Sequence, residues 1–421
     1  MSATAHERSL LRRSVVSWAL YDWANSAFAL TVLAALFPVF LNDYWSDGAA
    51  GSTVTTRLAF VNGTASIVVA VLAPLLGAIA DRGGARKRFL FFFAMLGIVM
   101  TGGLAFVAAG QWQYALILYL LASVGFYGGN VFYDALLLNV ARPGEFERVS
   151  AFGFGIGYGG SALLFALNTW MILQPAAFGL ASATVAVQVA FASVAIWWLV
   201  FSIPVWLFVP EERGDGPSFF AAAREGYGQL IGTFRELRRF RAAFIFIIAF
   251  WLYIDAVHTL IQMATNFGQR LGFGRDDLIR ALLITNFVGL PATLFFGWLG
   301  SRIGARPVIF IGLAVYVAVT CFALYLQTLT HFYVLAVTVG TVQGAVQGMS
   351  RAFFAQLVPA DKSAQFFGFY NMIGKFAAII GPFLVGITAS LSDNPRYAIA
   401  VLLPLFVSGA WLLSRVPTEQ R

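Results

Sequence analysis

The sequence GAIADRGGARKR, at Gly77–Arg88, joins two long apolar stretches through a short turn rich in glycine and arginine. A related sequence, GWLGSRIGAR at Gly297–Arg306, joins two further apolar stretches in the same way, with Ser301 where the first copy has Asp81. Two membrane-spanning helices joined by a tight basic turn, and repeated in both halves, are typical of a duplicated membrane carrier. The repeat therefore predicts a polytopic membrane protein built from two similar parts.

The composition agrees with this prediction. Of the 421 residues, 60% are hydrophobic and only 11% are charged, whereas about 25% of residues are charged in a soluble globular domain. Since one spanning helix needs about 20 apolar residues, the pattern predicts an all-α membrane protein with twelve transmembrane helices in two pseudo-symmetric six-helix bundles. The predicted helices cover residues 15–41, 57–80, 89–109, 113–140, 150–172, 183–209, 242–267, 278–300, 307–327, 331–357, 366–389 and 396–414.

The net charge of +8 comes from the uneven placement of Lys and Arg, so it does not indicate a nucleic-acid partner. Most basic residues fall in loops on the same side as the N-terminus, with the cluster Arg270–Arg280 as an exception. The positive-inside rule places the basic side in the cytoplasm. The sequence thus predicts cytoplasmic termini and a place in a bacterial inner (plasma) membrane.

A polar segment divides the chain. The stretch Pro210–Pro217 is rich in residues that break helices, and it predicts an N-terminal bundle over 1–209 and a C-terminal bundle over 242–421. Between them, residues 210–241 form a cytoplasmic linker in which apolar residues after Ser218 recur every three or four positions beside several arginines. This pattern predicts an amphipathic helix in the headgroup layer; a passive basic linker is the alternative.

The two basic turns suggest a latch. Glycine at position 77 allows close helix packing, and Asp81 is expected to bind backbone N–H groups at the start of the helix near 366, where the helix dipole favours a negative charge. Such a contact would hold one side of the carrier closed. The alternative is that the basic residues only set the topology. The predicted latch residues are Gly77, Asp81, Arg82, Arg86, Lys87, Arg88, Arg302 and Arg306.

Two acidic residues lie inside predicted helices at equivalent places in the two halves. Asp22 and Asp255 are each followed by a polar side chain at i+3 and a hydroxyl at i+4, all on one helical face. A charge within a span costs about 2.5–3.5 kcal/mol on insertion scales, so it needs a partner, water or a function. The predicted cavity residues are Tyr21, Asp22, Asn25, Asp134, Tyr253, Asp255 and His258.

Asp255 and His258 lie one turn apart and form the best candidate proton site, because His titrates near physiological pH. Substrate contact without coupling, and a purely structural role, are the alternatives. Aromatic residues beside the acidic clusters are candidates to line a pocket for an apolar or aromatic solute.

Asp134 and Arg351 lie near predicted cytoplasmic helix ends in opposite halves, and Lys375 lies about two to three turns into the predicted helix 366–389. Opposite charges from opposite halves predict an ion pair that forms only when the cytoplasmic side closes. Pairing of Lys375 with Asp134 or with Asp22 fits this prediction, and the sequence does not choose between them. The alternative to a functional pairing is that these helix ends are simply hydrated.

The chain resembles the major facilitator superfamily, and within it the Unknown Major Facilitator family, which includes autophagy-related vacuolar amino-acid effluxers. It departs from the family pattern after Asp255 and after Asp134, where Ala256 and Leu138-Asn139 stand in place of the usual residues. The resemblance rests on Tyr21–Phe28, Asp81–Arg88, Phe132–Asp134, Ser150–Gly160, Gln343–Arg351 and Phe366–Tyr370.

The resemblance implies a secondary active transporter that works by alternating access and exports neutral or aromatic amino acids. Its expected partners are a small-molecule solute, membrane lipid and protons, with no nucleic acid, no cofactor and no metal, in a monomer. An exporter of drugs, siderophores or lipids on the same fold, and a non-transporting membrane receptor or scaffold, are the alternatives. No arrangement of nucleophile and base indicates an enzyme.

Overall fold

The computed structural model describes residues 10–46, 48–49, 51–211, 238–376, 380–391 and 395–417, and within these ranges the chain is helical, without strands. Helices are expected because a bilayer offers no hydrogen-bond partners to the backbone, so each segment must satisfy its own N–H and C=O groups. The first part contains α2 (Arg13–Ala27), η1 (Phe28–Leu36), α3 (Phe37–Phe40), η2 (Leu41–Trp45), α4 (Gly51–Gly83), α5 (Arg86–Gly103), η3 (Leu104–Phe106), α6 (Trp112–Ala135), α7 (Leu137–Val140), α8 (Phe146–Leu173), η4 (Pro175–Phe178) and α9 (Ala183–Phe208).

The second part follows residue 238. It contains α11 (Arg241–Arg270), α12 (Arg275–Ile303), α13 (Ala305–Ala323), α14 (Leu329–Leu357), η5 (Ala360–Lys362), α15 (Ser363–Phe376), α16 (Ile380–Leu391), α17 (Pro395–Ala400) and α18 (Leu403–Ser414).

Ten helical runs among the described residues are long and apolar enough to cross a membrane, and they match the first ten predicted spans. The predicted span 366–389 falls on α15 and α16, and residues 377–379 between them lie outside the described part of the chain. The predicted span 396–414 is described as two shorter helices, α17 and α18. The predicted helix 15–41 also changes character, because it becomes a π-helix at Phe28–Leu36.

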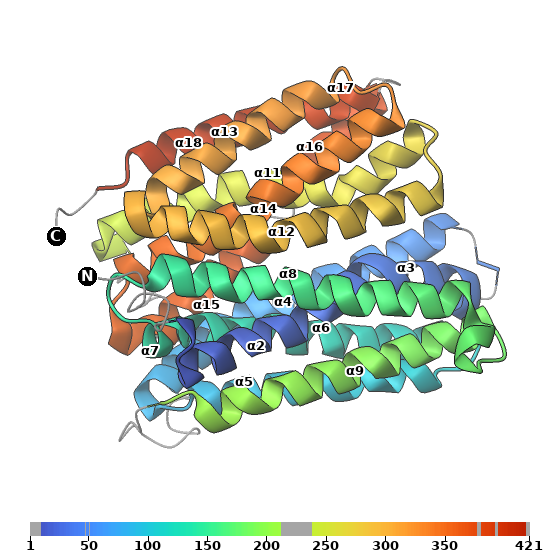
Figure 1. Cartoon of the computed structure of the whole chain (residues 1–421), viewed down its shortest axis with the longest axis horizontal. Helices are drawn as coiled ribbons and strands as arrows, with labels where there is room; N and C mark the ends of the chain where they lie inside the picture. Colours follow the sequence, from blue (N-terminus) through green and yellow to red (C-terminus); the bar gives the residue numbers. More distant parts are fainter. Residues whose placement is uncertain are drawn as a thin grey trace.

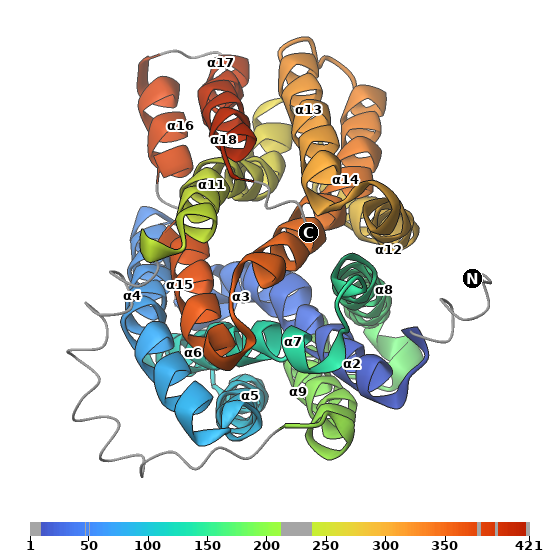
Figure 2. The ribbon, with the colours of Figure 1, turned by 90° about the vertical axis from the view of Figure 1, so that its left-hand side faces the viewer.

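The helices form two groups with one exception. Seen from its left-hand end, the bundle has the helices of the first part on one side and those of the second part on the other (Figure 2). The exception is α15, which packs mainly against α4 and α6 of the first part, although it also contacts α11 of the second part, as α16 does. The predicted boundaries at 209 and 242 stay a prediction, because residues 212–237, with most of the linker and its expected amphipathic helix, lie outside the described residues.

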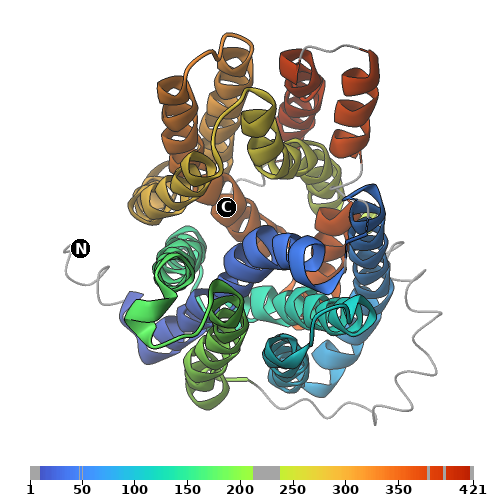
Figure 3. The ribbon, with the colours of Figure 1, turned by 90° about the vertical axis from the view of Figure 1, so that its right-hand side faces the viewer.

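The two groups meet along α8 and α12. These helices lie side by side in the views from both ends of the bundle (Figures 2 and 3). The approach is close because glycines face apolar side chains: a Cβ atom added at Gly297 would overlap with that of Ala151, and one added at Gly155 would lie 3.1 Å from a methyl carbon of Leu294.

Both glycine- and arginine-rich turns lie at one end of the bundle, the left-hand end of Figure 1, where α2 begins and α18 ends. We call it the basic end. Contacts between the two groups of helices toward this end include the residues of the candidate site.

Candidate functional site

A central cavity of about 410 Å³ lies between the two groups of helices. Its lining combines aromatic rings, among them Phe126, Phe154 and Phe250, with charged and amide side chains. Residues of the π-helix η1 also line it, which agrees with the frequent occurrence of π-helical turns at functional sites. The polar lining residues are Asp22, Asn25, Ser26, Asn130, Tyr133, Asp134, Tyr158, Ser161, His258, Thr285, Asn286, Gln343, Gln347, Arg351, Tyr370 and Asn371.

Three charged side chains meet in the cavity wall. The Arg351 Nη1 donates to Oδ1 of Asp134 at 3.0 Å and lies 3.5 Å from Oδ2 of Asp22. The Tyr133 hydroxyl donates to the same Asp22 oxygen at 3.0 Å. Among these three charged residues, one cation faces two carboxylates.

Arg351 comes from α14, but its partners lie in the first part of the chain. Its Nε donates to the Ser150 hydroxyl at 2.9 Å and its Nη2 to the Ser150 carbonyl at 2.8 Å. Its guanidinium lies 4.1 Å from the ring centre of Phe154 and 4.8 Å from that of Trp18, distances suited to cation–π attraction. Arg351 is 2% exposed. Its buried guanidinium connects α14 to α2, α6 and α8 through these contacts.

Arg351 is the cation that the structure describes beside the two acidic residues, and the predicted pairing with Lys375 stays untested. Asp22 and Asp134 pair with Arg351, and the neutral Asn371 of α15 donates to Oδ2 of Asp134 at 2.9 Å. The side chain of Lys375, one turn further along α15, lies outside what the structure describes. Among the described side chains, ion pairs between the two halves are present with Arg351 as the cation, while their role as a gate stays a prediction.

The first basic turn makes the contact expected from the sequence. Oδ1 and Oδ2 of Asp81 accept hydrogen bonds from the N–H groups of Ala364 and Gln365, at 3.0 and 2.8 Å, at the start of α15. Gly77 lies one turn earlier, and a Cβ atom there would overlap with the Ala364 carbonyl. Asp81 thus caps a helix of the other half, while a latch role in transport stays a prediction.

The basic residues of this turn reach into neighbouring segments. Arg86 donates to Asp81 at 2.8 Å, to the Asn139 side chain at 2.8 Å and to the carbonyl of Ala360 at 3.0 Å. Lys87 donates from its Nζ to the Val209 carbonyl at 2.7 Å. Arg88 is exposed, and the side chain of Arg82 lies outside the described part of the structure.

The end of α9 is fastened to the same turn. The Glu211 carboxylate accepts from the backbone N–H of Lys87 at 3.2 and 3.3 Å. Burial raises the pKa of the Glu211 carboxyl, and the N–H bonds and the charges of Arg86 and Lys87 partly offset this rise.

The second basic turn has no comparable cap. The Ser301 hydroxyl donates to the carbonyl of Trp298 in its own helix at 2.7 Å. Arg302 lies over the ring of Trp298, and Arg306 donates to the carbonyl of Ser414 at 2.6 Å. Two glycines of this copy pack against α8 of the other half, Gly297 against Ala151 and Gly300 against Glu147. The difference follows from Ser301, whose short neutral side chain stays within its own turn.

Asp255 departs from the prediction. It does not line the central cavity, although His258 does. Instead its Oδ2 accepts from the N–H of Gly381 at 2.9 Å, at the start of α16, and its Oδ1 lies 3.4 Å from the hydroxyl of Thr259. The buried Asp255 therefore fastens α16 to α11 rather than sharing a cavity face with His258.

The two predicted tyrosines also lie behind the cavity wall. Tyr253 shares a 2.6 Å hydrogen bond with Ser350, next to Arg351, and Tyr21 packs against the ring of Tyr133. Neither is a lining residue of the cavity.

Several site residues were not predicted. Asn130 accepts from Asn25 at 2.6 Å, Ser150 holds the arginine, and Asn371 binds Asp134. A neutral amide or hydroxyl within a span gives a weaker sequence signal than a charge, although Ser150 opens the glycine-rich stretch already noted. Within the described ranges, no three His, Cys, Asp or Glu side chains are grouped so that they could hold a metal ion.

The chain is similar to known transporters over most of its length. The family described as "Vacuole effluxer Atg22 like" matches residues 52–145 and 139–421. The uncharacterized MFS-type transporter YxiO of Bacillus subtilis is 37% identical over 407 residues, which cover 96% of this chain and 94% of that protein. Autophagy-related protein 22 of Yarrowia lipolytica is 22% identical over 441 residues, covering 84% of this chain and 74% of that protein.

Solved structures show the same fold at low sequence identity. The human organic anion transporter MFSD10 superposes with a TM-score of 0.74 at 16% identity, covering 96% of this chain and 99% of that one. The proton:xylose symporter XylE gives 0.72 at 15% identity, covering 99% and 97%. The protein is thus a membrane transporter and not an enzyme, and it belongs to the Atg22-like family of the major facilitator superfamily.

Proposed function

We propose that the protein is a proton-coupled carrier of neutral amino acids. The observation that carries this proposal is the set of Asp22, Asp134 and Arg351 beside amide side chains in one central cavity. A zwitterion presents an ammonium group and a carboxylate, and these groups pair with the two charge signs that the cavity wall offers. The description of the family as vacuole effluxers similar to Atg22 supports a small solute of metabolism.

Binding of such a solute would also release the gate. Its carboxylate competes for the Arg351 guanidinium, and its ammonium group offers Asp22 or Asp134 another partner. Because Arg351 joins α14 to helices of the first part, loss of its ion pairs weakens the contact between the two groups of helices. Solute binding and opening of the basic end are coupled in this way.

We place the coupling proton on the pair Asp22 and Asp134. Two carboxylates share one guanidinium there, and a proton on one of them removes the unmatched charge. The pair lines the cavity, whereas Asp255 is bound to α16. His258 lines the cavity as well and is a second candidate to receive the proton.

We take the basic end to be cytoplasmic, as the positive-inside rule predicts, in the inner membrane of a bacterium and in a monomer. Efflux from a vacuole carries solute into the cytoplasm, and the same topological direction at a plasma membrane is uptake. The family description therefore does not by itself support the export expected from the sequence, and direction needs its own measurement.

The test is solute counterflow in proteoliposomes with labelled leucine, isoleucine and tyrosine, and with lysine as the charged control. Exchange of the neutral amino acids supports the proposal, and its loss in Asp22→Asn or Asp134→Asn assigns it to the cavity. Absence of exchange for all of them, from protein that is monodisperse and thermally stable, overturns the amino-acid proposal and directs the search to drugs, siderophores or lipids. Comparing inward and outward proton gradients then gives the direction and the coupling.

A further inference from the structure

The polar lining of the central cavity includes two layers. One layer holds the charges of Asp22, Asp134 and Arg351. The other holds three amide side chains, each three or four residues from one of these charges on the same helix. They are Asn25 of α2, which follows Asp22, Asn130 of α6, which precedes Asp134, and Gln347 of α14, which precedes Arg351. We call these three side chains the amide layer.

The amide layer lies farther from the basic end than the charges do. Helix α2 begins at the basic end, so Asn25 lies beyond Asp22. Helices α6 and α14 end there, because the helices before them, α5 and α13, begin at the two basic turns. Asn130 and Gln347 therefore also lie beyond the charges of their own helices. At a helical rise of about 1.5 Å per residue, the two layers are about 4.5–6 Å apart.

Hydrogen bonds hold the amide layer and leave part of it free. The Asn25 Nδ2 donates to Oδ1 of Asn130 at 2.6 Å, and the Tyr158 hydroxyl donates to Oε1 of Gln347 at 2.8 Å. Within the described part of the chain, the Asn25 oxygen and the NH₂ groups of Asn130 and Gln347 have no further partner. The amide layer thus offers the cavity two NH₂ donors and one carbonyl acceptor.

The two bonded pairs lie at one level of the cavity. Tyr158 follows Gly157 on α8, and a Cβ atom added at Gly157 would lie 2.9 Å from the hydroxyl oxygen of Ser26, the residue after Asn25. Both pairs therefore flank the space about one helical turn beyond the charges.

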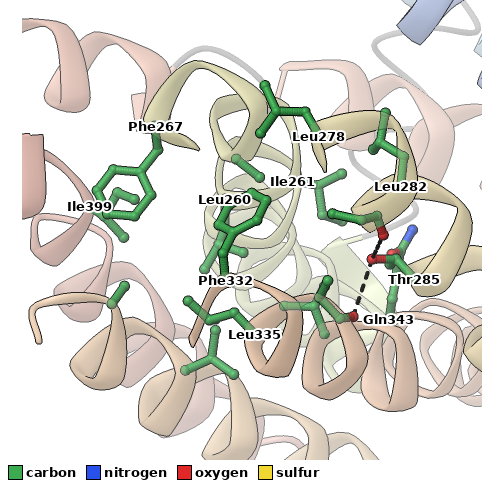
Figure 4. Close-up of a pocket in the computed structure, with 16 residues that line it drawn as sticks. Leu260, Ile261, Phe267, Leu278, Leu282, Thr285, Phe332, Leu335, Gln343 and Ile399 are labelled. Carbon is green, nitrogen blue, oxygen red and sulfur yellow. Dashed lines mark hydrogen bonds between the residues drawn. The ribbon is translucent and has the colours of Figure 1, made fainter. Parts of the chain in front are cut away.

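A separate apolar pocket of about 80 Å³, within the helices of the second part, lies farther away. In Figure 4, Thr285 and Gln343 lie on the side of this pocket opposite Phe267 and Ile399. Thr285 and Gln343 also line the central cavity, so they mark where the two spaces meet. Gln343 lies eight residues, about 12 Å, along α14 from Arg351. A small amino acid bound at Arg351 therefore reaches the amide layer and not the apolar pocket.

We infer that the amide layer binds a carboxamide side chain of the transported solute, so that asparagine and glutamine are preferred over apolar amino acids of the same shape. The inference rests on the proposed function, since the ammonium and carboxylate groups of the solute would pair with the charges. A carboxamide offers an acceptor oxygen and NH₂ donors, which match the free NH₂ groups of Asn130 and Gln347 and the free oxygen of Asn25. An apolar side chain would take water from these groups without replacing its hydrogen bonds, which disfavours its binding.

The test compares solutes of similar shape in counterflow, asparagine with leucine and glutamine with methionine, at one subsaturating concentration. A site that hydrogen-bonds a group of its solute rejects the analogue without that group more strongly than an apolar pocket rejects one methylene, which is about 10- to 200-fold. We expect the wild-type protein to exchange asparagine at least about tenfold faster than leucine. This preference should be lost in Asn130→Leu, which replaces the amide by an apolar group of the same shape.

Two further variants keep the result interpretable. Asn168→Leu is the matched control, because Asn168 is a buried amide of α8 that accepts from Ser193 and does not line the cavity. It should leave the asparagine-to-leucine ratio unchanged. If Asn130→Leu does not fold, Gln347→Met removes the other free NH₂ group and keeps a side chain of similar length.

The outcomes separate the inference from the function. If the wild-type protein exchanges amino acids but asparagine is no faster than leucine, the inference is wrong and the proposed function stands. The inference is also wrong if asparagine is faster and both cavity variants keep that preference, since the amide layer then does not bind the side chain. If the wild-type protein exchanges no amino acid, the function and the inference both fail.

Discussion

At the scale of single residues, Arg351 is the cation that joins the two groups of helices in the central cavity, and its proposed role is to keep the basic end closed. Removing one partner of a buried ion pair costs about 3–5 kcal/mol, and here the partners come from both parts of the chain. We therefore predict that Arg351→Ala shifts the protein toward a state open at the basic end. Spin labels at the exposed positions Arg142 and Ile303, in a background where the exposed Cys321 is replaced by serine, would report a longer distance between the two parts.

The matched control is Arg415→Ala, because Arg415 is also at the basic end but exposed beside Trp411. Arg351→Lys keeps the charge but lacks the planar fork of donors, so its distance distribution should lie between those of the wild type and the alanine variant. An unchanged distance in Arg351→Ala would show that the packing of helices, and not the ion pairs, keeps this end closed.

Asp255 leads to a second prediction at this scale. An asparagine there still offers an oxygen to the Gly381 N–H, whereas alanine leaves that donor without it, at a cost of about 1–3 kcal/mol. We predict that Asp255→Asn keeps the pH dependence of exchange, and that Asp255→Ala lowers the unfolding temperature. If Asp255→Asn instead abolishes the pH dependence, while Asp134→Asn does not, the proton site belongs to Asp255 as the sequence suggested.

The sequence identified most charged residues of the site because a charge in an apolar span is conspicuous. It named Asp22, Asp134 and Arg351, but not which of them pair. Pairing depends on the side-chain directions of helices far apart in the chain, and Asp255 shows the limit: its i+3 and i+4 neighbours share its helical face, yet its carboxylate turns to the backbone of α16. Ser150 and Asn371 carry no charge and so gave no comparable signal.

At the scale of elements, α15 belongs to the second part of the chain but packs mainly against α4 of the first part. Its first N–H groups are bound by Asp81 of α4, and loss of such a cap costs about 0.5–2 kcal/mol. We predict that Asp81→Ala speeds hydrogen exchange at the amides of Ala364 and Gln365. Ser301→Ala is the matched control from the second basic turn, because the Ser301 hydroxyl bonds only within its own helix. Equal protection in both variants would leave the Asp81 contact without a measurable role.

The elements themselves were largely predictable, and their interruptions were not. Long apolar runs bounded by polar turns set the helix positions, so α8, α9 and α14 begin and end within a few residues of the predicted bounds. The π-helix at Phe28–Leu36, within the first predicted span, has no such signal in the apolar pattern of the sequence.

At the scale of the whole molecule, the duplicated motif sets up the contact between the two groups of helices. Its first glycine in each copy packs against the other half: Gly77 against Ala364 and Gly297 against Ala151. The repeat in the sequence therefore predicted an arrangement of two similar parts. It did not predict that, of the two described copies, only the first also caps a helix, which follows from Asp81 and Ser301 and makes the contacts at the basic end asymmetric.

The glycines give the last prediction. A Cβ atom at Gly77 would overlap with the backbone of Ala364, and backbone cannot rotate away as a flexible side chain can. Gly77→Ala should therefore push α15 from α4 and lengthen the Arg142–Ile303 distance. Gly63→Ala lies on the same helix α4, with open space around the added carbon, and should leave the distance unchanged. It is a matched control because both substitutions raise the helix propensity of α4 by about the same amount. If Gly77→Ala keeps the wild-type distance, α4 and α15 can separate without opening the end, and closure belongs to α8 and α12, where Gly297→Ala is the variant to measure.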